Sequence, residues 1–282
     1  MIRAALPAPH VIPASGGFPV LLSVPHSGTD YPDWLIRESR RGKASLEVLE
    51  DPLVDRLLWR ALPLGCGAVI ARAPRAAVDC NRSEREIDPT TTGMSPAVDP
   101  GPRARGGLGI VPTRTHYDGE LWRRRISREE MERRIVQGWR PYHRALHFGL
   151  EELQRRHVEV LLLDCHSMPS RDGRQAQVVL GDRHGSTASR WLGDLARRTL
   201  EQAGYSTSFN DPYAGGWIVE GFGKPSRGVH ALQIELDRSL YLDPTSRKAG
   251  AEFDRTARML EDLVRTLGQA LLDRATIPQA AE

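Results

Sequence analysis

The side chains best suited to chemistry follow a short apolar run, residues 160–163, which continues into Asp164, Cys165 and His166. A continuous apolar run of this kind is typical of a buried central strand in a parallel sheet. Catalytic and ligand-binding groups of open α/β sheets gather just past the carboxyl ends of such strands. A neutral imidazole there is a good metal ligand, and a nearby carboxylate can fix its tautomer. His166 is therefore a candidate ligand, although an isolated histidine is more often structural.

Polar residues also close the strands predicted at 18–24 and 76–82. His26 lies just beyond the first strand in a Pro/Gly turn, and Asn81 and Arg82 close the second. Two histidines and a carboxylate from separate elements are what a catalytic zinc site requires, with a fourth position open for water. The planar fork of Arg82 suits a carboxylate or an oxyanion. These groups favour a metal site at the strand ends.

Two predicted elements supply carboxylates. Asp51 and Asp55 are four residues apart in a helix predicted over 46–62, so they are expected to share one face of it. Glu235 lies in an otherwise apolar strand, where a carboxylate is costly unless it is paired or functional. An ion pair with Arg238 is the structural alternative for Glu235.

Alternating strands and helices are expected to position these groups. The strands are predicted at 18–24, 67–71, 76–82, 160–168, 177–182 and 229–236, and the helices at 46–62, 127–156, 187–203 and 246–272. This alternation predicts an α/β sandwich with a mixed, mostly parallel sheet. Without an internal repeat or a clear linker, residues 1–282 are expected to form a single domain.

Three segments have signals of their own. Residues 83–120 are dense in Pro and Gly, and a loop of that length is usually functional or disordered, so it is a candidate lid over the site. Ser127 and Glu130 form a capping box at the start of the next helix, which is expected to kink near Pro141. The first dozen residues and residues 205–228 are expected to be mostly irregular.

The composition is that of an ordinary globular chain, with 282 residues, 40% hydrophobic and 27% charged. No apolar run is long enough to span a bilayer, and the prolines near the N-terminus argue against a signal peptide. Cys66, Cys80 and Cys165 are too few for a disulfide framework and suit reduced thiols. A cytoplasmic location without a membrane partner is therefore expected.

The net charge of +3 is only mildly basic. Arginines cluster at Arg123–Arg125 and Arg133–Arg134, in segments that are patterned as helix. A solvated helix face is the usual explanation of such runs, so no nucleic-acid partner is expected.

Taken together, the strand-end motifs resemble the N-formylglutamate amidohydrolase family over residues 18–245. The resemblance rests on Val24-Pro-His-Ser-Gly28, Val78-Asp-Cys-Asn-Arg82, Trp139-Arg-Pro-Tyr-His143, Leu163-Asp-Cys-His-Ser167, Ala214-Gly-Gly216 and Ala231-Leu-Gln-Ile-Glu-Leu236. It implies a three-layer α/β/α, phosphorylase/hydrolase-like fold, related to zinc carboxypeptidases and aspartoacylase-type deacylases. It also implies hydrolysis of an N-acyl amide on a small amino-acid substrate, with formate and glutamate released in the type reaction of histidine catabolism.

The resemblance also implies roles for individual residues. One Zn²⁺, or another divalent metal, would be held by His26, Asp51 and His166, with Asp55 not excluded as the third ligand. Glu235 would be the general base, and Arg82 would serve both catalysis and substrate binding. The remaining substrate-binding positions would be Asn81, Gly215, Gly216 and Trp217.

One stretch departs from the family pattern. Trp217 fills the position after the double glycine, and Glu220 stands where the family commonly carries an arginine. A like charge facing the second carboxylate of formylglutamate would weaken its binding, which favours a neutral or basic amino acid instead. In the alternative, Glu220 points elsewhere and Arg183 or Arg227 serves. Rival functions are a zinc carboxypeptidase or deacetylase-type hydrolase, and a non-catalytic binding relative. The oligomeric state does not follow from the sequence.

Overall fold

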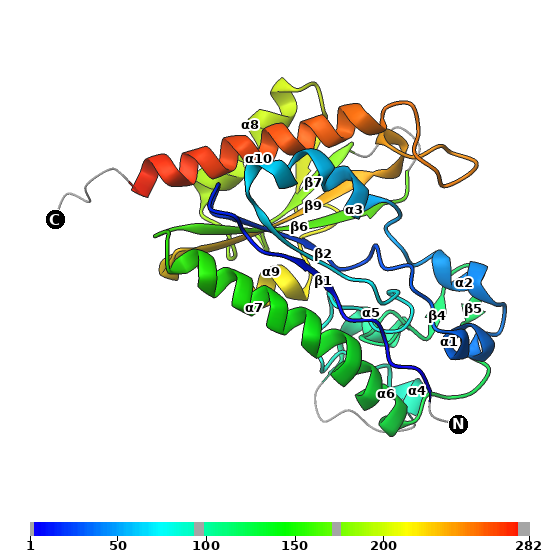
Figure 1. Ribbon diagram of the computed structural model, residues 1–282. Coiled ribbons are helices and arrows are strands. Elements are labelled where there is room, and N and C mark those ends of the chain that lie inside the picture. Colours follow the sequence, from blue (N-terminus) through cyan, green and yellow to red (C-terminus); the bar gives the residue numbers. More distant parts are fainter. Residues whose placement is uncertain (1–2, 93–98, 171–175, 276–282) are drawn as a thin grey trace. The chain divides into compact units, whose positions relative to one another are not determined.

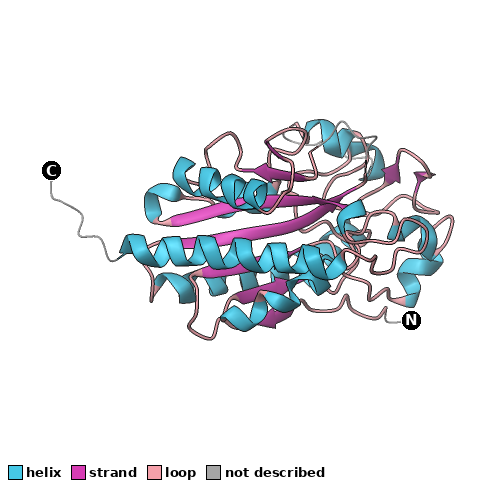
Figure 2. Ribbon diagram, turned by 90° about the horizontal axis from the view of Figure 1, so that it is seen from above, coloured by secondary structure: helices cyan, strands magenta, loops and turns pink. Residues whose placement is uncertain are grey.

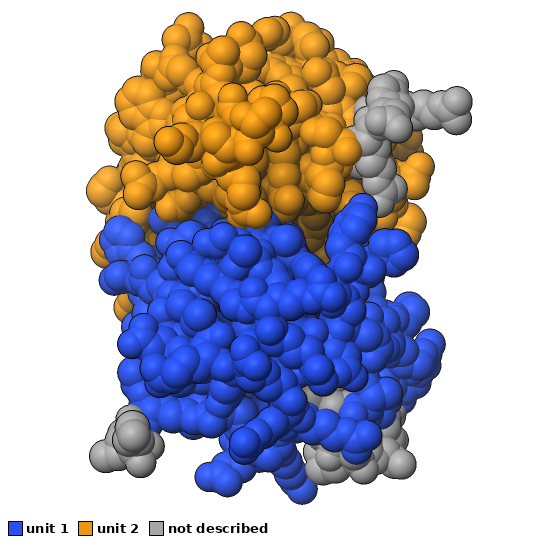
Figure 3. Space-filling view, turned by 90° about the vertical axis from the view of Figure 1, so that its right-hand side faces the viewer, with its two compact units in different colours: residues 1–10, 25–50, 70–145 blue, residues 11–24, 51–69, 146–282 orange. Residues whose placement is uncertain are grey.

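The computed structural model describes residues 3–92, 99–170 and 176–275 (Figure 1). Its contacts divide the chain into two compact units, coloured separately in Figure 3. Unit 1 comprises residues 1–10, 25–50 and 70–145, and unit 2 comprises residues 11–24, 51–69 and 146–282. The single domain expected over residues 1–282 stays a prediction.

Unit 2 is built on a seven-stranded sheet in the order β1-β3-β2-β6-β9-β7-β8. The strands are β1 (His10–Ile12), β2 (Val20–Val24), β3 (Gly67–Ile70), β6 (Val160–Met168), β7 (Val178–Gly181), β8 (Thr207–Phe209) and β9 (Val229–Asp237). The pairs β2–β6, β6–β9 and β7–β8 are parallel, whereas β7–β9 is antiparallel. The predicted mixed, mostly parallel sheet is confirmed.

The central strands β6 and β9 are buried along their whole length. Their burial requires helices on both faces. In unit 2, α8 (Arg190–Gln202) and α10 (Phe253–Ala275) cover one face, and α9 (Trp217–Phe222) lies on the other with residues 146–154 of α7 (Arg140–Gln154) (Figure 1). Figure 2 shows the sheet from the side of α8 and α10. This layering confirms the α/β sandwich, and no described helix is both long and apolar enough to cross a membrane.

The C-terminal helix, α10, packs on the sheet through one apolar stripe. The positions of this stripe are fully buried or nearly so, namely Leu260, Leu263, Val264, Leu267 and Leu271. Burying a side chain of this size contributes about 1.5–3 kcal/mol. The helix begins at Phe253, later than the predicted residue 246.

Unit 1 consists of short elements around a core of its own. They are α1 (Asp33–Glu38), α2 (Lys43–Glu47), α4 (Pro89–Thr92), α5 (Gly101–Arg105), α6 (Arg128–Arg134) and the hairpin of β4 (Arg114–Thr115) and β5 (Gly119–Glu120). Trp34, Leu35, Ile110, Leu121 and Trp122 are among the buried residues that fill this core. The predicted 83–120 loop therefore carries secondary structure of its own, and its residues 93–98 lie outside the described part of the chain.

The helix predicted over 46–62 is wrong, because the chain breaks in its middle. After α2 comes a loop, followed by α3 (Val54–Leu57) and 3₁₀ turns at 58–60 and 62–64. Pro52 disfavours a helical conformation in the residue before it, and Leu53 is left-handed with φ 61°. Asp51 consequently lies in a loop and does not share a helix face with Asp55.

The strand predicted at 76–82 is also wrong, because this segment is a buried loop. The side chain of Asp79 accepts a hydrogen bond from the backbone N–H of Asn81 at 2.8 Å, and Ala77 N–H donates to the Pro74 carbonyl. These local bonds satisfy backbone groups that a strand would pair with a neighbour. In addition, β1, β8 and α9 form in stretches expected to be irregular.

The helix predicted over 127–156 is confirmed in position but not in regularity. Ser127 caps α6 by accepting from the backbone N–H of Glu130 at 3.1 Å, as the capping box predicts. A π-helical turn, Ile135–Trp139, then leads into α7. Such a turn just before Pro141 accommodates a residue that has no N–H to donate.

Candidate active site

The carboxyl end of β6 holds His166 in one orientation. Asp164 and His166 are two residues apart on the strand and therefore point to the same face. Their side chains meet, with His166 Nε2 2.9 Å from Asp164 Oδ2. The second oxygen of Asp164 accepts a hydrogen bond from the hydroxyl of Ser23 on β2 at 2.7 Å. This carboxylate–histidine arrangement fixes Nε2 and directs Nδ1 to the other side of the ring, as in metal-binding histidines.

Asp51 lies at that other side of the ring. Its Oδ2 is 3.1 Å from His166 Nδ1, and both side chains are buried. Two ligands of a tetrahedral zinc ion, each about 2.1 Å from the metal, stand about 3.4 Å apart. Asp55, the alternative ligand, instead forms an ion pair with Arg56 at 3.5 Å. The donor set of unit 2 thus fits a metal ion through Asp51 and His166.

Arg238 holds the second oxygen of Asp51. Its Nη2 donates to Asp51 Oδ1 at 3.2 Å, and its Nε donates to the hydroxyl of Ser167 at 3.2 Å. Sequence reasoning considered Arg238 only as an ion-pair partner of Glu235. The described contacts assign it to the candidate metal ligand, a role that no local spacing signals.

The charge around His166 is strongly negative. Burial alone would lower the pKa of His166, but Asp164, Asp51 and Glu235 outweigh it and hold that pKa well above its ordinary value. Buried carboxylates that raise the pKa of an imidazole also favour a metal cation in the same place.

Glu235 stands opposite His166 on the neighbouring strand. The parallel register of β6 and β9 pairs the two residues, so their side chains point to the same face. Gln233 Nε2 donates to Glu235 Oε1 at 2.9 Å, and Gln233 Oε1 accepts from the backbone N–H of Gly216 at 2.8 Å. Gln233 thereby links the candidate base to the double glycine. Sequence reasoning assigned it no role, although its spacing from Glu235 places both on one face.

The first residue of the double glycine, Gly215, packs closely against the end of β7. Gly215 has φ +110°, and a Cβ there would lie 2.6 Å from a methyl group of Val219. A Cβ on Gly181 would likewise lie 2.7 Å from the backbone nitrogen of Gly215. Glycine is therefore required for this approach, and Trp217 begins α9 directly after it.

Glu220 on α9 forms an ion pair with Arg183, with Nη2 2.8 Å from Oε2. Both side chains are partly exposed, Arg183 at 39% and Glu220 at 48%. An ion pair of this exposure adds little to stability, but it neutralises the acid locally.

In unit 1, Asp79 organises the predicted ligand His26. Oδ1 of Asp79 is 2.7 Å from His26 Nε2, and its Oδ2 accepts from Arg75 Nε at 2.8 Å. Burial would raise the pKa of Asp79, but the charges of Arg75 and His26 hold it well below its ordinary value. His26 thus has the same carboxylate-fixed Nε2 as His166, with Nδ1 on the other side of its ring.

Arg82 is buried and oriented by backbone carbonyls. Its Nε donates to the Leu108 carbonyl at 3.0 Å and its Nη1 to the Asn81 carbonyl at 2.8 Å. Two of the five N–H groups of the guanidinium are used in this way, and the others retain the capacity to bind a carboxylate. The distance of 3.8 Å to Glu86 Oε2 makes that contact a loose one.

Trp139 and His143 support the loop that carries Asn81 and Arg82. Trp139 Nε1 donates to the Arg82 carbonyl at 2.8 Å, and His143 Nε2 donates to the Cys80 carbonyl at 2.8 Å. The two rings stack with centroids 3.8 Å apart. The Trp-to-His motif of the sequence therefore positions the predicted substrate-binding pair.

The family model of N-formylglutamate amidohydrolase matches residues 18–242, which is most of the chain. The chain belongs to this family. Its relatives include the N-formylglutamate deformylases of Pseudomonas putida and Pseudomonas aeruginosa. They are 30% identical over 242 residues and 31% identical over 241 residues, and the matches cover 82% and 81% of this chain and 84% of each relative.

A solved family structure agrees with this assignment. The crystal structure of N-formylglutamate amidohydrolase from Ralstonia eutropha JMP134 is 31% identical, covers 95% of this chain and 99% of its own, and has a TM-score of 0.88. A more distant structure, from Agrobacterium tumefaciens, is 19% identical with a TM-score of 0.69 and covers 93% of this chain and 94% of its own. The expected hydrolase-like fold is therefore confirmed.

Proposed function

We propose that this chain hydrolyses the formamide bond of N-formylglutamate and releases formate and glutamate, in a metal-dependent reaction. The proposal draws on the deformylase relatives, which carry this activity in their names. The observation that carries it is the buried His166–Asp51 pair, whose imidazole is fixed by Asp164 beside the register-matched Glu235.

The proposed metal ligands are His26, Asp51 and His166, which offer two imidazoles and one carboxylate. Nitrogen and carboxylate donors suit zinc, and iron or manganese are the alternatives. When bound, the ion would lower the pKa of a water molecule and polarise the formyl carbonyl. Asp164 and Asp79 would keep the two imidazoles oriented toward it.

The residues of the chain have distinct tasks in this reaction. Glu235, oriented by Gln233, takes a proton from the attacking water and delivers it to the nitrogen of glutamate as the C–N bond breaks. Asn81 and Arg82 bind the α-carboxylate of the substrate, and this anchor selects N-acyl amino acids over simple amides. Gly215, Gly216 and Trp217 are the proposed wall for the amino-acid side chain.

The test combines metal analysis of the purified protein with an activity screen. N-formylglutamate, other N-formyl and N-acetyl amino acids, and dipeptides with a free C-terminus are compared after the metal-free protein is reloaded with zinc. The proposal predicts one divalent ion per chain and highest kcat/KM for an N-formyl amino acid. Cleavage of peptides alone would indicate a carboxypeptidase instead. A protein that is purified without a metal ion and hydrolyses no amide after zinc is added would indicate a binding function.

A further inference from the structure

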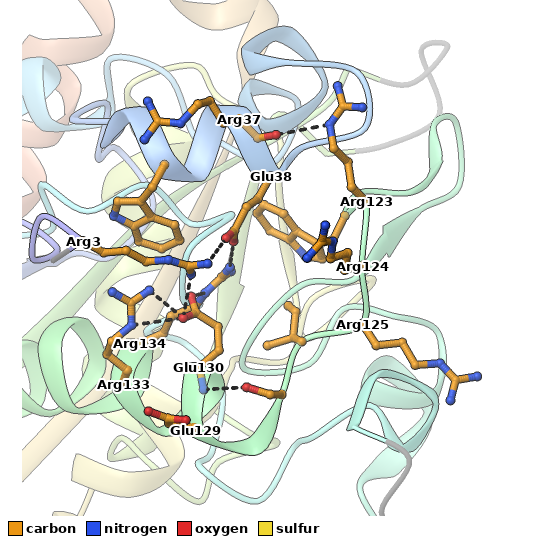
Figure 4. A pocket seen from close by; sticks show the side chains of 14 residues that line it. Arg3, Arg37, Glu38, Arg123, Arg124, Arg125, Glu129, Glu130, Arg133 and Arg134 are labelled. Carbon is orange, nitrogen blue, oxygen red and sulfur yellow. Dashed lines mark hydrogen bonds and ion pairs between the residues drawn. The ribbon is translucent and has the colours of Figure 1, made fainter. Parts of the chain in front are cut away.

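A cavity lies within unit 1, apart from every residue assigned to the candidate active site (Figure 4). Its volume is about 770 Å³, within the range of small-molecule sites. Its lining includes seven arginines and three glutamates. The arginine runs of this region do not form the solvated helix face that their pattern predicts, for two reasons.

First, Arg123–Arg125 are not helical, because they lie in the loop before α6. Second, Arg134 on α6 is not solvated, because only 1% of its side chain is exposed. The guanidinium of Arg134 lies over the rings of both Trp34 and Trp122, at 5.2 Å and 4.6 Å from their centroids. The arginine runs therefore line the wall of a cavity.

One wall is held together by shared glutamates. Arg3, Arg133 and Arg134 gather around Glu130, with contacts of 3.0, 2.5 and 2.9 Å, and Arg3 and Arg134 also pair with Glu38 (Figure 4). With Glu129 on the same helix, three glutamates offset the three arginines of this wall, so the positive excess of the lining comes from its other arginines. Burial between its neighbours holds the guanidinium of Arg134 in place in this wall.

The opposite wall carries arginines that no carboxylate neutralises. It is formed by the segment Arg123–Arg125, with Arg37 contributed by α1 (Figure 4). Within the described part of the chain, Arg37, Arg124 and Arg125 have no ion-pair partner, and the side chain of Arg123 donates only to the backbone carbonyl of Arg37. The lining as a whole keeps a positive excess that the protein does not balance.

We propose that this cavity binds a small, multiply charged phosphate anion, of the diphosphate or nucleoside-diphosphate type. Arginine presents a planar fork that matches phosphate oxygens in pairs, and the positive excess of this lining favours a multivalent anion over a monovalent one. The cavity is concave and has the volume of a small-molecule site, which distinguishes it from a flat basic surface for nucleic acid.

The experiment titrates inorganic pyrophosphate into the full-length protein by calorimetry, at low and at physiological salt. Arg37→Gln/Arg124→Gln is compared with the control Arg128→Gln/Arg144→Gln, which removes two exposed arginines of unit 1 outside the cavity. We expect one site in the wild type, binding weakened about tenfold or more in the first variant, and wild-type binding in the control. No binding to the wild type, or an equal loss in both variants, would overturn the proposal.

Further arms identify the anion and its place. ADP and pyrophosphate distinguish a nucleotide from an inorganic source, because only a nucleotide site binds ADP more tightly than pyrophosphate. Citrate binding as tightly as pyrophosphate would refute the phosphate class. His166→Ala should leave pyrophosphate binding unchanged, whereas a loss in that variant would place the anion at the candidate metal site and contradict the proposal.

Discussion

Asp51 Oδ2 lies 3.1 Å from His166 Nδ1, while Arg238 holds the other oxygen of the same carboxylate at 3.2 Å. The two candidate ligands of unit 2 are thus brought together by different elements, a loop and a strand end. Each has a second partner that fixes its orientation, since Asp164 holds the imidazole at 2.9 Å. Such outer contacts set the geometry of a metal site before the metal binds.

The ligand assignment predicts a clear difference between two neighbouring aspartates. Asp51→Asn and His166→Ala should each remove most bound metal and nearly all activity, because a ligand is lost from a small donor set. Asp55→Asn is the matched control and should keep both, since Asp55 pairs with Arg56. Metal content by mass spectrometry and circular dichroism check the result and the fold. Full metal occupancy in His166→Ala would exclude the assignment.

Arg238 is expected to tune the metal affinity. Arg238→Gln removes the contacts to Asp51 and Ser167, so the affinity for zinc should fall about 10- to 100-fold. Competition with a chelator measures the affinity, and turnover at saturating zinc should recover in large part. Arg190→Gln, on an exposed arginine of α8, is the control. An unchanged zinc affinity in Arg238→Gln would mean that Asp51 is positioned without it.

The site residues that can be predicted from the sequence are those that lie on long apolar strands. His166 and Glu235 end buried runs of β6 and β9, so their strand and their end of the sheet follow from hydrophobic pattern. Asp51 was harder to place, because the leucine spacing around it fits a helix that Pro52 interrupts. The spacing of the leucines alone does not reveal that interruption.

Long-range partners do not follow from spacing. Asp79 orients His26 across a loop that sequence pattern presents as a strand, and Arg238 reaches Asp51 from a position 187 residues away. The cavity around Arg134 shows the same limit, since a charged helix face predicts exposure but the two tryptophans beside it enforce burial. Tertiary contacts decide these cases.

Glu235 is expected to act as a base without being a ligand. Glu235→Gln keeps the shape of the side chain and removes the proton acceptor, so kcat should fall by about a hundredfold or more. Bound metal should remain, which separates this variant from His166→Ala. Steady-state kinetics with metal analysis on the same samples provide the test. Near-normal turnover would show that Glu235 is structural.

Asp88 should make the stability of unit 1 depend on pH. It accepts from the Thr113 hydroxyl at 2.6 Å and from the Thr90 hydroxyl at 2.7 Å, and Arg114 lies 3.2 Å away. Burial would raise the pKa of Asp88, but these contacts outweigh it and lower that pKa. The stabilisation is therefore complete above the ordinary aspartate pKa of about 3.9 and is lost as the pH falls through the lower folded value.

Urea denaturation of wild type and Asp88→Asn measures this effect. At pH 7 the variant should be less stable by about 1 kcal/mol, and the difference should shrink toward zero as the pH falls below the ordinary aspartate pKa of about 3.9. Asp33→Asn, which alters an exposed aspartate at the start of α1, should leave the midpoint nearly unchanged at pH 7. A difference between wild type and Asp88→Asn that is constant with pH would contradict the role of the ionised carboxylate.

The Arg183–Glu220 pair bears on substrate choice. An unpaired Glu220 would repel the side-chain carboxylate of N-formylglutamate, but Arg183 lies 2.8 Å from it and offsets the charge. We therefore expect the wild type to accept N-formylglutamate.

Arg183→Gln, which leaves Glu220 unneutralised, should lower kcat/KM for this substrate about fivefold relative to N-formyl-leucine, on the scale of an exposed charge interaction. Adding Glu220→Gln should restore the ratio, because the repelling charge is gone. If Arg183→Gln leaves the ratio unchanged, the pair does not face the substrate side chain. A wild type that strongly prefers neutral or basic N-formyl amino acids, and gains N-formylglutamate activity in Glu220→Arg, would instead support the altered preference that the sequence first indicated.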